Sequence, residues 1–174
     1  MMSSGFDFSG KVAVVVGASS GLGADAARAY AEHGADVALL ARRLERLEAL
    51  KTEIEAAGRR AVAVRCDVTD EDSCRAAVDA VIDAYGRIDI LLNNAGVAVR
   101  GGVDTLTDAD WDRSFDTNVK GIFHVSKYVV PRMRERGYGK IVNIASVNAV
   151  IADKQDVFIR HAYNASKAAV LGLT

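Results

Sequence analysis

Two side chains near the end of the sequence have the types and spacing of a proton-transfer pair. The segment YNASK at residues 163–167 places Tyr163 and Lys167 four positions apart, one turn along the same face of a helix. A phenol has an ordinary pKa of about 10, and a cation within about 4 to 6 Å stabilises its charged form. The alternative is a helix start with two solvated polar ends, and this segment alone does not decide between them.

A glycine-rich segment near the N-terminus could hold a phosphate group. In GASSGLG, Gly17, Gly21 and Gly23 follow a valine-rich run and precede a helical pattern. Glycine at such a junction permits a tight turn, brings backbone N–H groups close to a pyrophosphate and lets the next helix approach closely. An ordinary glycine turn is the alternative, but a position between strand and helix favours a dinucleotide site.

The elements that would position these residues begin with a strand and helix unit that repeats. Val12, Val37 and Val62 are 25 residues apart, and each lies in a β-rich run. Between these runs, helical patterns over residues 24–33 and 44–57 each end at a glycine suited to a left-handed cap. A third helix is predicted over residues 70–85, with Thr69 and Asp72 as its capping pair.

Later segments continue the alternation of strands and helices. IDILLNNAG predicts a fourth strand, and a polar helix start at residues 107–111 precedes a long apolar periodicity over residues 118–136. Pro131 could kink that helix or shift its boundary. KIVNIAS, from Lys140, predicts a fifth strand, and YNASKAAVLGLT opens a further helix.

Nearly continuous apolar strands that alternate with helices predict a parallel sheet covered on both faces. We therefore expect a single α/β domain over residues 1–174, with the doubly wound (Rossmann) fold and a ligand site at the carboxyl ends of the strands. This fold normally has a sixth strand, whereas five are predicted here. We accordingly expect a chain that is incomplete at its C-terminus.

Composition excludes several classes of protein. With 50% hydrophobic and 26% charged residues and a net charge of −1, the chain should be folded, without a field suited to nucleic acid or anionic membranes. It has no signal-like start and no apolar run of membrane-spanning length, which predicts a cytoplasmic protein with a small-molecule partner. Cys66 and Cys74 are too few for a disulfide framework and lack metal-site spacing, so we expect two buried thiols and no metal.

Taken together, these motifs resemble the short-chain dehydrogenase/reductase family. The resemblance rests on GASSGLG, NNAG at residues 93–96, Asn118, Ser146 and YNASK, in the family's order and over nearly the whole chain. It implies that Tyr163 is the general acid or base for an alcohol proton, and that Lys167 binds the nicotinamide ribose and favours the phenolate. The resemblance further implies that Ser146 bonds the reacting oxygen and that Asn118 holds a water linked to Lys167.

Each of these two residues has a plainer alternative. Ser146 could cap a turn or a helix, and Asn118 could be a buried amide that satisfies backbone groups. Asp67 resembles the carboxylate that accepts from the adenine amino group, with a backbone contact from Val68, although it could merely begin a turn. The cofactor contacts that the resemblance implies comprise Gly17, Ser19, Ser20, Gly21, Leu22, Gly23, Asp67, Val68, Asn94, Ala95 and Gly96, together with Tyr163 and Lys167.

Cofactor choice depends on the end of the second strand. An acidic residue there would bond the adenosine ribose of NAD, but Ala41 takes this place and Arg42 and Arg43 follow it. A guanidinium can bind a 2′-phosphate, which favours NADP, whereas a solvated basic helix start is the alternative. Ser20 weighs toward NAD, because many NADP-using relatives carry a basic residue at that place.

The implied reaction is hydride transfer between NADP(H) and a secondary alcohol or ketone. The 16 residues between Ser146 and Tyr163 should border the substrate, and Lys154, Arg160 and His161 could attract a carboxylate there or could be solvated loop charges. Sugar acids, polyols, 3-oxoacyl compounds and hydroxysteroids all stay open as substrates. A non-catalytic dinucleotide sensor is the rival class, and apolar residues in the segment 118–136 and the helix beginning near Tyr163 predict an oligomer, a tetramer or dimer.

Overall fold

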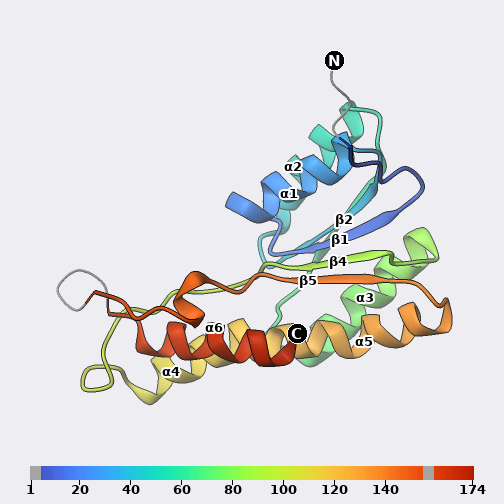
Figure 1. Ribbon diagram of the computed structural model, residues 1–174. Coiled ribbons are helices and arrows are strands. Elements are labelled where there is room, and N and C mark those ends of the chain that lie inside the picture. Colours follow the sequence, from blue (N-terminus) through green and yellow to red (C-terminus); the bar gives the residue numbers. More distant parts are fainter. Residues whose placement is uncertain (1–4, 155–158) are drawn as a thin grey trace.

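The computed structural model describes residues 5–154 and 159–174 (Figure 1). Its five strands are all parallel and form one sheet in the order β3-β2-β1-β4-β5. This order confirms the doubly wound α/β fold predicted from the sequence, because the chain runs outward in one direction from β1 and then crosses back to continue on its other side. The strands are β1 (Val12–Val16), β2 (Asp36–Ala41), β3 (Ala61–Arg65), β4 (Ile90–Asn93) and β5 (Lys140–Asn143).

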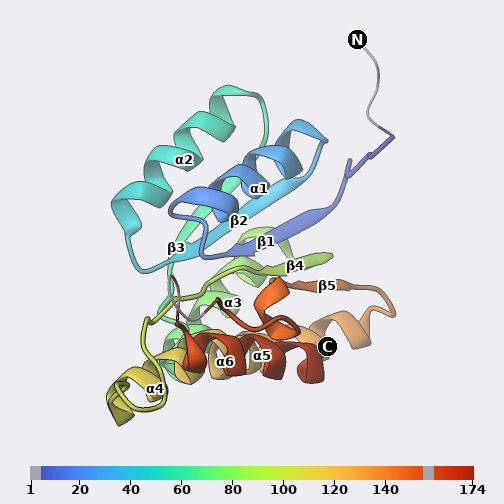
Figure 2. The same ribbon diagram turned by 60° about the vertical axis from the view of Figure 1, so that its left-hand side comes forward.

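Helices cover both faces of the sheet. In Figures 1 and 2, α1 and α2 lie on one face, whereas α3 and α5 lie on the other with α4 and α6 beside them. The helices are α1 (Gly21–Glu32), α2 (Leu44–Ala56), α3 (Glu71–Tyr85), α4 (Asp108–Phe115), α5 (Gly121–Glu135) and α6 (His161–Leu173), with a π-helical turn η1 (Asp116–Lys120) and a 3₁₀ turn η2 (Val147–Ala149).

The central strand explains why the strand sequences are apolar without alternation. All five residues of β1 are buried; Val14 packs in a cluster with residues of α3 and α5, and Val15 packs in a second cluster with residues of α1 and α2. Each face of the strand therefore has its own core. Cys66 and Cys74 are buried in the first of these clusters, as predicted.

Strand β5 differs from the others because it lies at the edge of the sheet. Ile141 and Val142 are 36% and 44% exposed, although their side chains are as apolar as those of Leu91 and Leu92, which are buried at the paired positions of β4. Strand β4 pairs with one edge of β5, and among the described residues no strand pairs with the other edge. Its carboxyl end leads directly into the segment that carries Ser146.

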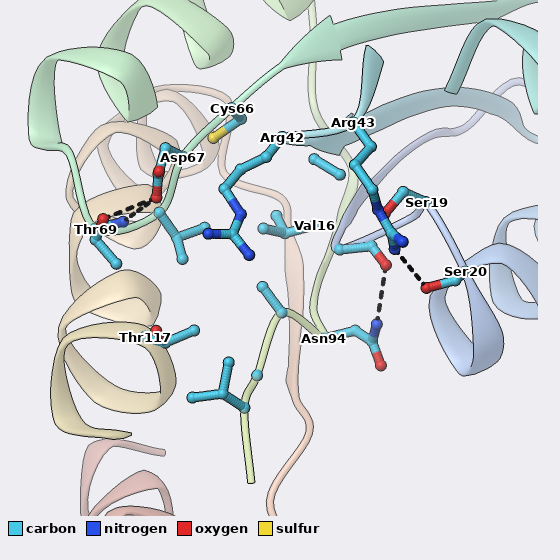
Figure 3. A pocket seen from close by; sticks show the side chains of 16 residues that line it. Val16, Ser19, Ser20, Arg42, Arg43, Cys66, Asp67, Thr69, Asn94 and Thr117 are labelled. Carbon is cyan, nitrogen blue, oxygen red and sulfur yellow. Dashed lines mark hydrogen bonds between the residues drawn. The ribbon is translucent and has the colours of Figure 1, made fainter. Parts of the chain in front are cut away.

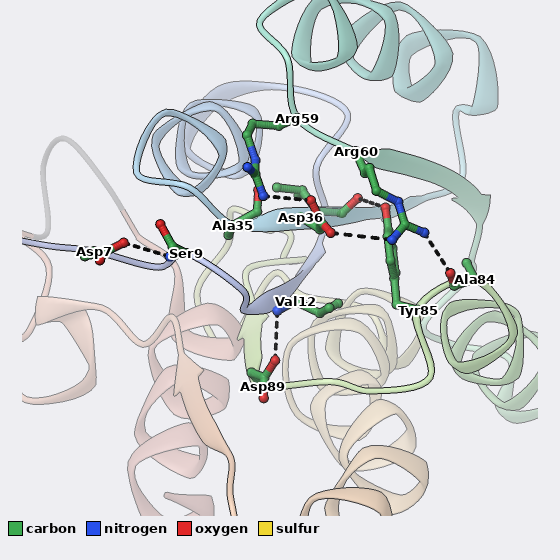
Figure 4. A network of polar contacts seen from close by, with 11 residues as sticks. Asp7, Ser9, Val12, Ala35, Asp36, Arg59, Arg60, Ala84, Tyr85 and Asp89 are labelled. Atoms are coloured by element: carbon green, nitrogen blue, oxygen red, sulfur yellow. Dashed lines mark hydrogen bonds and ion pairs between the residues drawn. The ribbon is translucent and has the colours of Figure 1, made fainter.

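A buried carboxylate fixes the amino ends of the strands (Figure 4). The side chain of Asp89 is fully buried and accepts hydrogen bonds from the Val12 amide at 2.9 Å and from the Arg87 guanidinium at 2.6 Å. Arg136, at the end of α5, lies 3.3 Å from the same carboxylate. Burial alone would raise the pKa of Asp89, but these hydrogen bonds and the two arginines hold it below its ordinary value.

Beside this carboxylate, a second set of polar contacts joins β2 to the residues around it (Figure 4). Arg59 pairs with Asp36 at 2.9 Å, and Tyr85 donates to the backbone carbonyl of Val37 at 3.1 Å. Both networks lie at the end of the sheet opposite the predicted ligand site. They therefore hold the scaffold in place and leave the other end for binding.

Two local predictions were wrong, as was one of the two alternatives given for Pro131, a shifted helix boundary. Helix α1 begins at Gly21, three residues earlier than predicted, because the glycine loop turns directly into the helix. Asp70 caps α3 by accepting from the amides of Asp72 and Ser73, whereas Thr69 turns away to bond Asp67. Pro131 neither ends nor delimits its helix, since α5 continues through it to Glu135.

Candidate cofactor cleft and catalytic centre

A cleft of about 610 Å³ opens at the carboxyl ends of β1 to β4, where the fold predicts a ligand (Figure 3). It brings together four segments that are far apart in the sequence: the glycine loop, the end of β2, the end of β3 and the loop after β4. Its lining includes most of the predicted cofactor residues, namely Gly17, Ser19, Ser20, Arg42, Arg43, Asp67, Val68, Asn94, Ala95 and Gly96. Gly21, Leu22 and Gly23, also predicted, lie just beyond it in the first turn of α1.

The glycine loop has no room for side chains at two of its positions. A Cβ atom on Gly17 would lie 2.8 Å from the backbone nitrogen of Ala95, and one on Gly23 would collide with the carbonyl of Gly17. Gly17 also has a φ of +85°, which side chains rarely adopt. Asn94 contributes from the facing loop by donating to the Gly17 carbonyl at 3.3 Å. The loop is thus held open to the cleft by close backbone contact with the segment after β4.

Two arginines enter the cleft from the end of β2, and they point in different directions (Figure 3). Arg43 donates to the hydroxyl of Ser19 at 2.9 Å and to that of Ser20 at 2.8 Å. Arg42 instead extends toward the middle of the cleft, on the side of Asp67. Ser20 itself is uncharged, but the guanidinium of Arg43 brings a positive charge to this place in the glycine loop.

Asp67 closes the cleft at the end of β3. Its carboxylate accepts hydrogen bonds from the Thr69 amide at 3.0 Å and the Thr69 hydroxyl at 2.8 Å. Burial raises the pKa of Asp67, but these bonds and the positive charges of Arg42 and Arg65 more than offset that effect and lower it. Asp67 is therefore a charged acceptor that begins a turn, which was the plainer alternative for it, and its contact with the adenine amino group stays a prediction.

Lys167 is the most unusual polar residue of the predicted catalytic set. Only 4% of the residue is exposed, and its ammonium donates to the backbone carbonyl of Ile144 at 2.5 Å. Burial lowers the pKa of Lys167, since the charged form is costly away from water. The same nitrogen lies 5.8 Å from the centre of the Tyr163 ring. The structure thus brings the YNASK pair together, one turn apart on α6.

Asn118 lies in the π-helical turn η1 and is fully buried. Its amide oxygen accepts from the Val97 backbone at 2.8 Å, and its amide nitrogen donates to the Val97 carbonyl and to the Ser166 hydroxyl, each at 2.9 Å. The plainer role weighed for it, an amide that satisfies backbone groups, therefore describes its contacts. Asn118 and Lys167 both lie close beneath Gly96, at the floor of the loop after β4. The water-holding role of Asn118 stays a prediction.

Ser146 lies between β5 and η2, and the structure gives it a partner that the sequence did not reveal. Its hydroxyl accepts from the Asn148 amide at 3.2 Å, so it caps η2 as one alternative predicted. Among the described residues, no hydrogen bond joins Ser146 to Tyr163. Ser166 was also missed; its hydroxyl donates to the Tyr163 carbonyl at 2.7 Å and fixes the turn of α6 that carries the YNASK pair.

The predicted loop charges have separate surroundings. Arg160 forms an ion pair with Asp153 at 2.7 Å, and His161 accepts from the Val103 amide at 3.0 Å, while Lys154 is exposed. Arg160 is therefore engaged by the protein, whereas His161 stays exposed and has one backbone partner. In the part of the chain that the structure describes, no helix is long and apolar enough to cross a bilayer, and no cluster of acidic, histidine or cysteine side chains could hold a metal ion.

Fold and site together define a dinucleotide-binding α/β domain in which a buried lysine lies beneath a tyrosine. A family model described as short chain dehydrogenase matches residues 11–174. D-threitol dehydrogenase from Mycolicibacterium smegmatis is 44% identical over 171 residues, which cover 97% of this chain and 64% of that protein. The chain belongs to the short-chain dehydrogenase family.

Solved structures agree with this assignment. A short-chain type dehydrogenase/reductase from Mycobacterium marinum superposes with a TM-score of 0.92 and 38% identity, covering 97% of this chain and 66% of the other. A short chain dehydrogenase/reductase from Burkholderia phymatum in complex with NAD has a TM-score of 0.90 and 35% identity, covering 97% of this chain and 59% of the other. The chain thus spans about three fifths to two thirds of the length of the proteins it matches.

Proposed function

We propose that the protein transfers a hydride between NADP(H) and a secondary alcohol or ketone. The observation that carries the proposal is the buried ammonium of Lys167, which is held one helical turn from Tyr163 and lies close to Gly96, a residue that lines the dinucleotide-sized cleft. Such a cation is costly to bury and is retained where it acts on a neighbour. Bound NADP(H) would supply or accept the hydride, held by the glycine loop, Asp67 and the arginines at the end of β2.

In this proposal the chain's own residues handle the proton and orient the substrate. Tyr163 donates the proton to the oxygen of a ketone, or removes it from an alcohol, as a general acid or base. Lys167 stabilises the phenolate form that results, and its hydrogen bond to the Ile144 carbonyl keeps the ammonium in place. Ser146 holds the reacting oxygen through its hydroxyl.

We infer a preference for NADP from the two arginines. Arg42 extends into the cleft, and Arg43 is fixed on the hydroxyls of Ser19 and Ser20, so two guanidinium groups would be available to bind a 2′-phosphate. Cofactor choice in the family is not uniform, since the similar structure from Burkholderia phymatum holds NAD. The absence of an acidic residue at Ala41 favours NADP in this chain.

For the substrate, we propose a small polyol or sugar acid. The support is the name of a relative, D-threitol dehydrogenase, which denotes a polyol substrate for that protein. Larger 3-oxoacyl and hydroxysteroid substrates are the alternatives. A non-catalytic dinucleotide sensor would need the cleft but not the buried lysine beneath a tyrosine, so the site favours an enzyme.

The proposal is tested with a panel of substrates. Oxidation of NADPH or NADH is followed by absorbance with sugar ketones, 3-oxoacyl thioesters and steroid ketones, and formation of NADPH from NADP is followed with polyols. The Tyr163→Phe variant should bind NADPH normally and lose about 10²- to 10⁴-fold in turnover, because it lacks only the proton donor. Tyr138→Phe is a matched control, since Tyr138 does not line the cleft and its ring is covered by the ammonium of Lys11. Near-normal turnover of Tyr163→Phe would reject the role of Tyr163. Tight NADPH binding with no turnover across the panel would favour the sensor.

A further inference from the structure

A cluster of polar side chains around Asp153 lies beside the catalytic centre and has no part in the proposed mechanism. The carboxylate of Asp153 accepts from Asn148 Nδ2 at 2.6 Å, from Arg160 Nη2 at 2.7 Å and from Asn164 Nδ2 at 3.1 Å. We call these four residues the Asp153 cluster. Three donors from separate parts of the segment 148–164 thus converge on one acid.

The cluster is buried more deeply than loop charges usually are. The side chain of Asp153 is 7% exposed and that of Arg160 is 23% exposed. The hydrogen bond from Arg160 outweighs the effect of burial and keeps the pKa of Asp153 below its ordinary value, so the acid is charged at neutral pH. A charged acid at this depth costs free energy unless its partners stay in place, which makes the arrangement a rigid one.

One end of the cluster reaches Ser146. The Asn148 side chain, held by Asp153, lies with its Oδ1 3.3 Å from the Ser146 hydroxyl, and the Asn148 amide donates to the same hydroxyl at 3.2 Å. These two contacts hold the Ser146 oxygen in place, while its single proton can rotate from Asn148 Oδ1 to the oxygen of a substrate. Asp153 therefore sets the position of the Ser146 hydroxyl through Asn148.

The other end of the cluster reaches the helix that carries Tyr163. Arg160 directly precedes α6, and its guanidinium lies 5.4 Å from the centre of the Tyr163 ring. Asn164 follows Tyr163 in the chain. Its buried Oδ1 has no hydrogen-bond partner among the described residues, so Asp153, which accepts from the amide nitrogen, orients this side chain. Both contacts tie the first turn of α6 to the acid that also positions Ser146.

We propose that Asp153 is a positioning residue for the reaction. It fixes the position of the Ser146 hydroxyl relative to the start of α6 and the ring of Tyr163. The inference rests on the proposed function, because it assigns Asp153 an effect on groups that act there. Asp153 itself need not touch the substrate. It acts through Asn148 on one side and through Arg160 and Asn164 on the other.

The test compares Asp153→Asn with Asp104→Asn in the full chain. Asp104 and Asp153 both line a small cavity of about 240 Å³, but Asp104 is exposed and lies outside the cluster. Asparagine keeps the shape of Asp153 and removes the charge that holds the three donors. We expect faster hydrogen exchange of the Asn148 amide in Asp153→Asn than in Asp104→Asn, and unchanged binding of NADPH. With a substrate from the panel, kcat should fall about 10- to 100-fold, as small misplacements of reacting groups do.

A double-mutant cycle separates positioning from general destabilisation. Because Asp153 acts partly through Ser146, the loss of kcat caused by Asp153→Asn should be clearly smaller when Ser146→Ala is already present. Asp153→Glu, which restores the charge, should recover part of the rate. Unchanged exchange at Asn148, or losses of kcat that simply add in the double mutant, would overturn the proposal. A parent protein that turns over nothing would count against the proposed function, while the exchange experiment would still decide whether Asp153 holds Asn148.

Discussion

Replacement of Arg42 by alanine should weaken NADPH binding much more than NADH binding. The side chain extends into the cleft, and among the described residues it has no hydrogen-bond or ion-pair partner that would keep it elsewhere. A hydrogen bond to a charged group contributes about 1.5 to 3 kcal/mol. At about 1.4 kcal/mol for each tenfold change, this corresponds to a loss of about 10- to 140-fold in affinity.

Two features of the structure place the expected loss in the lower half of that range, at about 10- to 40-fold. Arg42 is exposed, so water screens its charge, and Arg43 remains on Ser19 and Ser20 to hold part of the phosphate. NADH has no 2′-phosphate, and its affinity should therefore change little.

Fluorescence titration of each variant with NADPH and NADH measures both affinities directly. Arg46→Ala is the matched control, because Arg46 is an exposed arginine in the first turn of α2 and does not line the cleft. Added salt should also weaken NADPH binding to the parent more than it weakens NADH binding. Equal losses of both cofactors in Arg42→Ala, or an equal effect of Arg46→Ala, would refute the assignment of Arg42 to the 2′-phosphate.

Three other predictions concern stability, the glycine loop and assembly. Asp89→Asn should lower the free energy of unfolding by about 3 kcal/mol, because it leaves two partly exposed arginines without their buried partner. The pKa of Asp89 is lowered in the folded state, so its contribution to the free energy of unfolding is present above the unfolded-state pKa of about 4 and is lost as the pH falls. Urea unfolding at several pH values should therefore show that the stability of the variant depends less on acid than that of the parent. An identical dependence would contradict this. Gly23→Ala should impair both folding and NADPH binding, because the added Cβ would collide with the carbonyl of Gly17. Gly172→Ala, in α6, has open space around it and should stabilise the chain by about 0.5 to 1 kcal/mol. Thermal unfolding and NADPH titration compare the two variants, and equal effects would be contrary to the geometry. The exposed apolar side chains Phe123 and Leu171, at 49% each, support the predicted oligomer through α5 and α6, and light scattering that shows a monomer at micromolar concentration would reject it.

The fold could be predicted from the sequence because its strands have cores on both faces. The valines of β1 have no alternation, and this pattern together with helices at regular spacing admits few architectures. The exposure of Ile141 and Val142 could not be predicted in the same way, since an edge strand and a central strand can share one apolar sequence. The π-helical turn around Asn118 was also missed, because it lies between two helical segments and the glycine that follows it, Gly121, is no specific signal of a π-helix.

The site was predictable where single residues follow strands, and less so where side chains meet across loops. The carboxyl ends of the strands placed Asp67 and Asn94 in the cleft without knowledge of their contacts. The pairing of Arg43 with Ser19 joins residues 24 positions apart in different loops, and no spacing rule gives it. The donors around Asp153 lie in a segment with no periodicity, so only the folded chain shows that one acid gathers them.

The order of the strands has a consequence for how the protein folds. Strand β1 pairs with β2 and also with β4, where Ala13 lies opposite Ile90, so the centre of the sheet depends on segments far apart in the chain. Sheets with such non-local pairing fold slowly, because the loop between the partners must close before the contacts form. The four segments that line the cleft become neighbours only when β4 has joined the sheet. A bound cofactor should therefore slow unfolding of the finished domain without accelerating its folding.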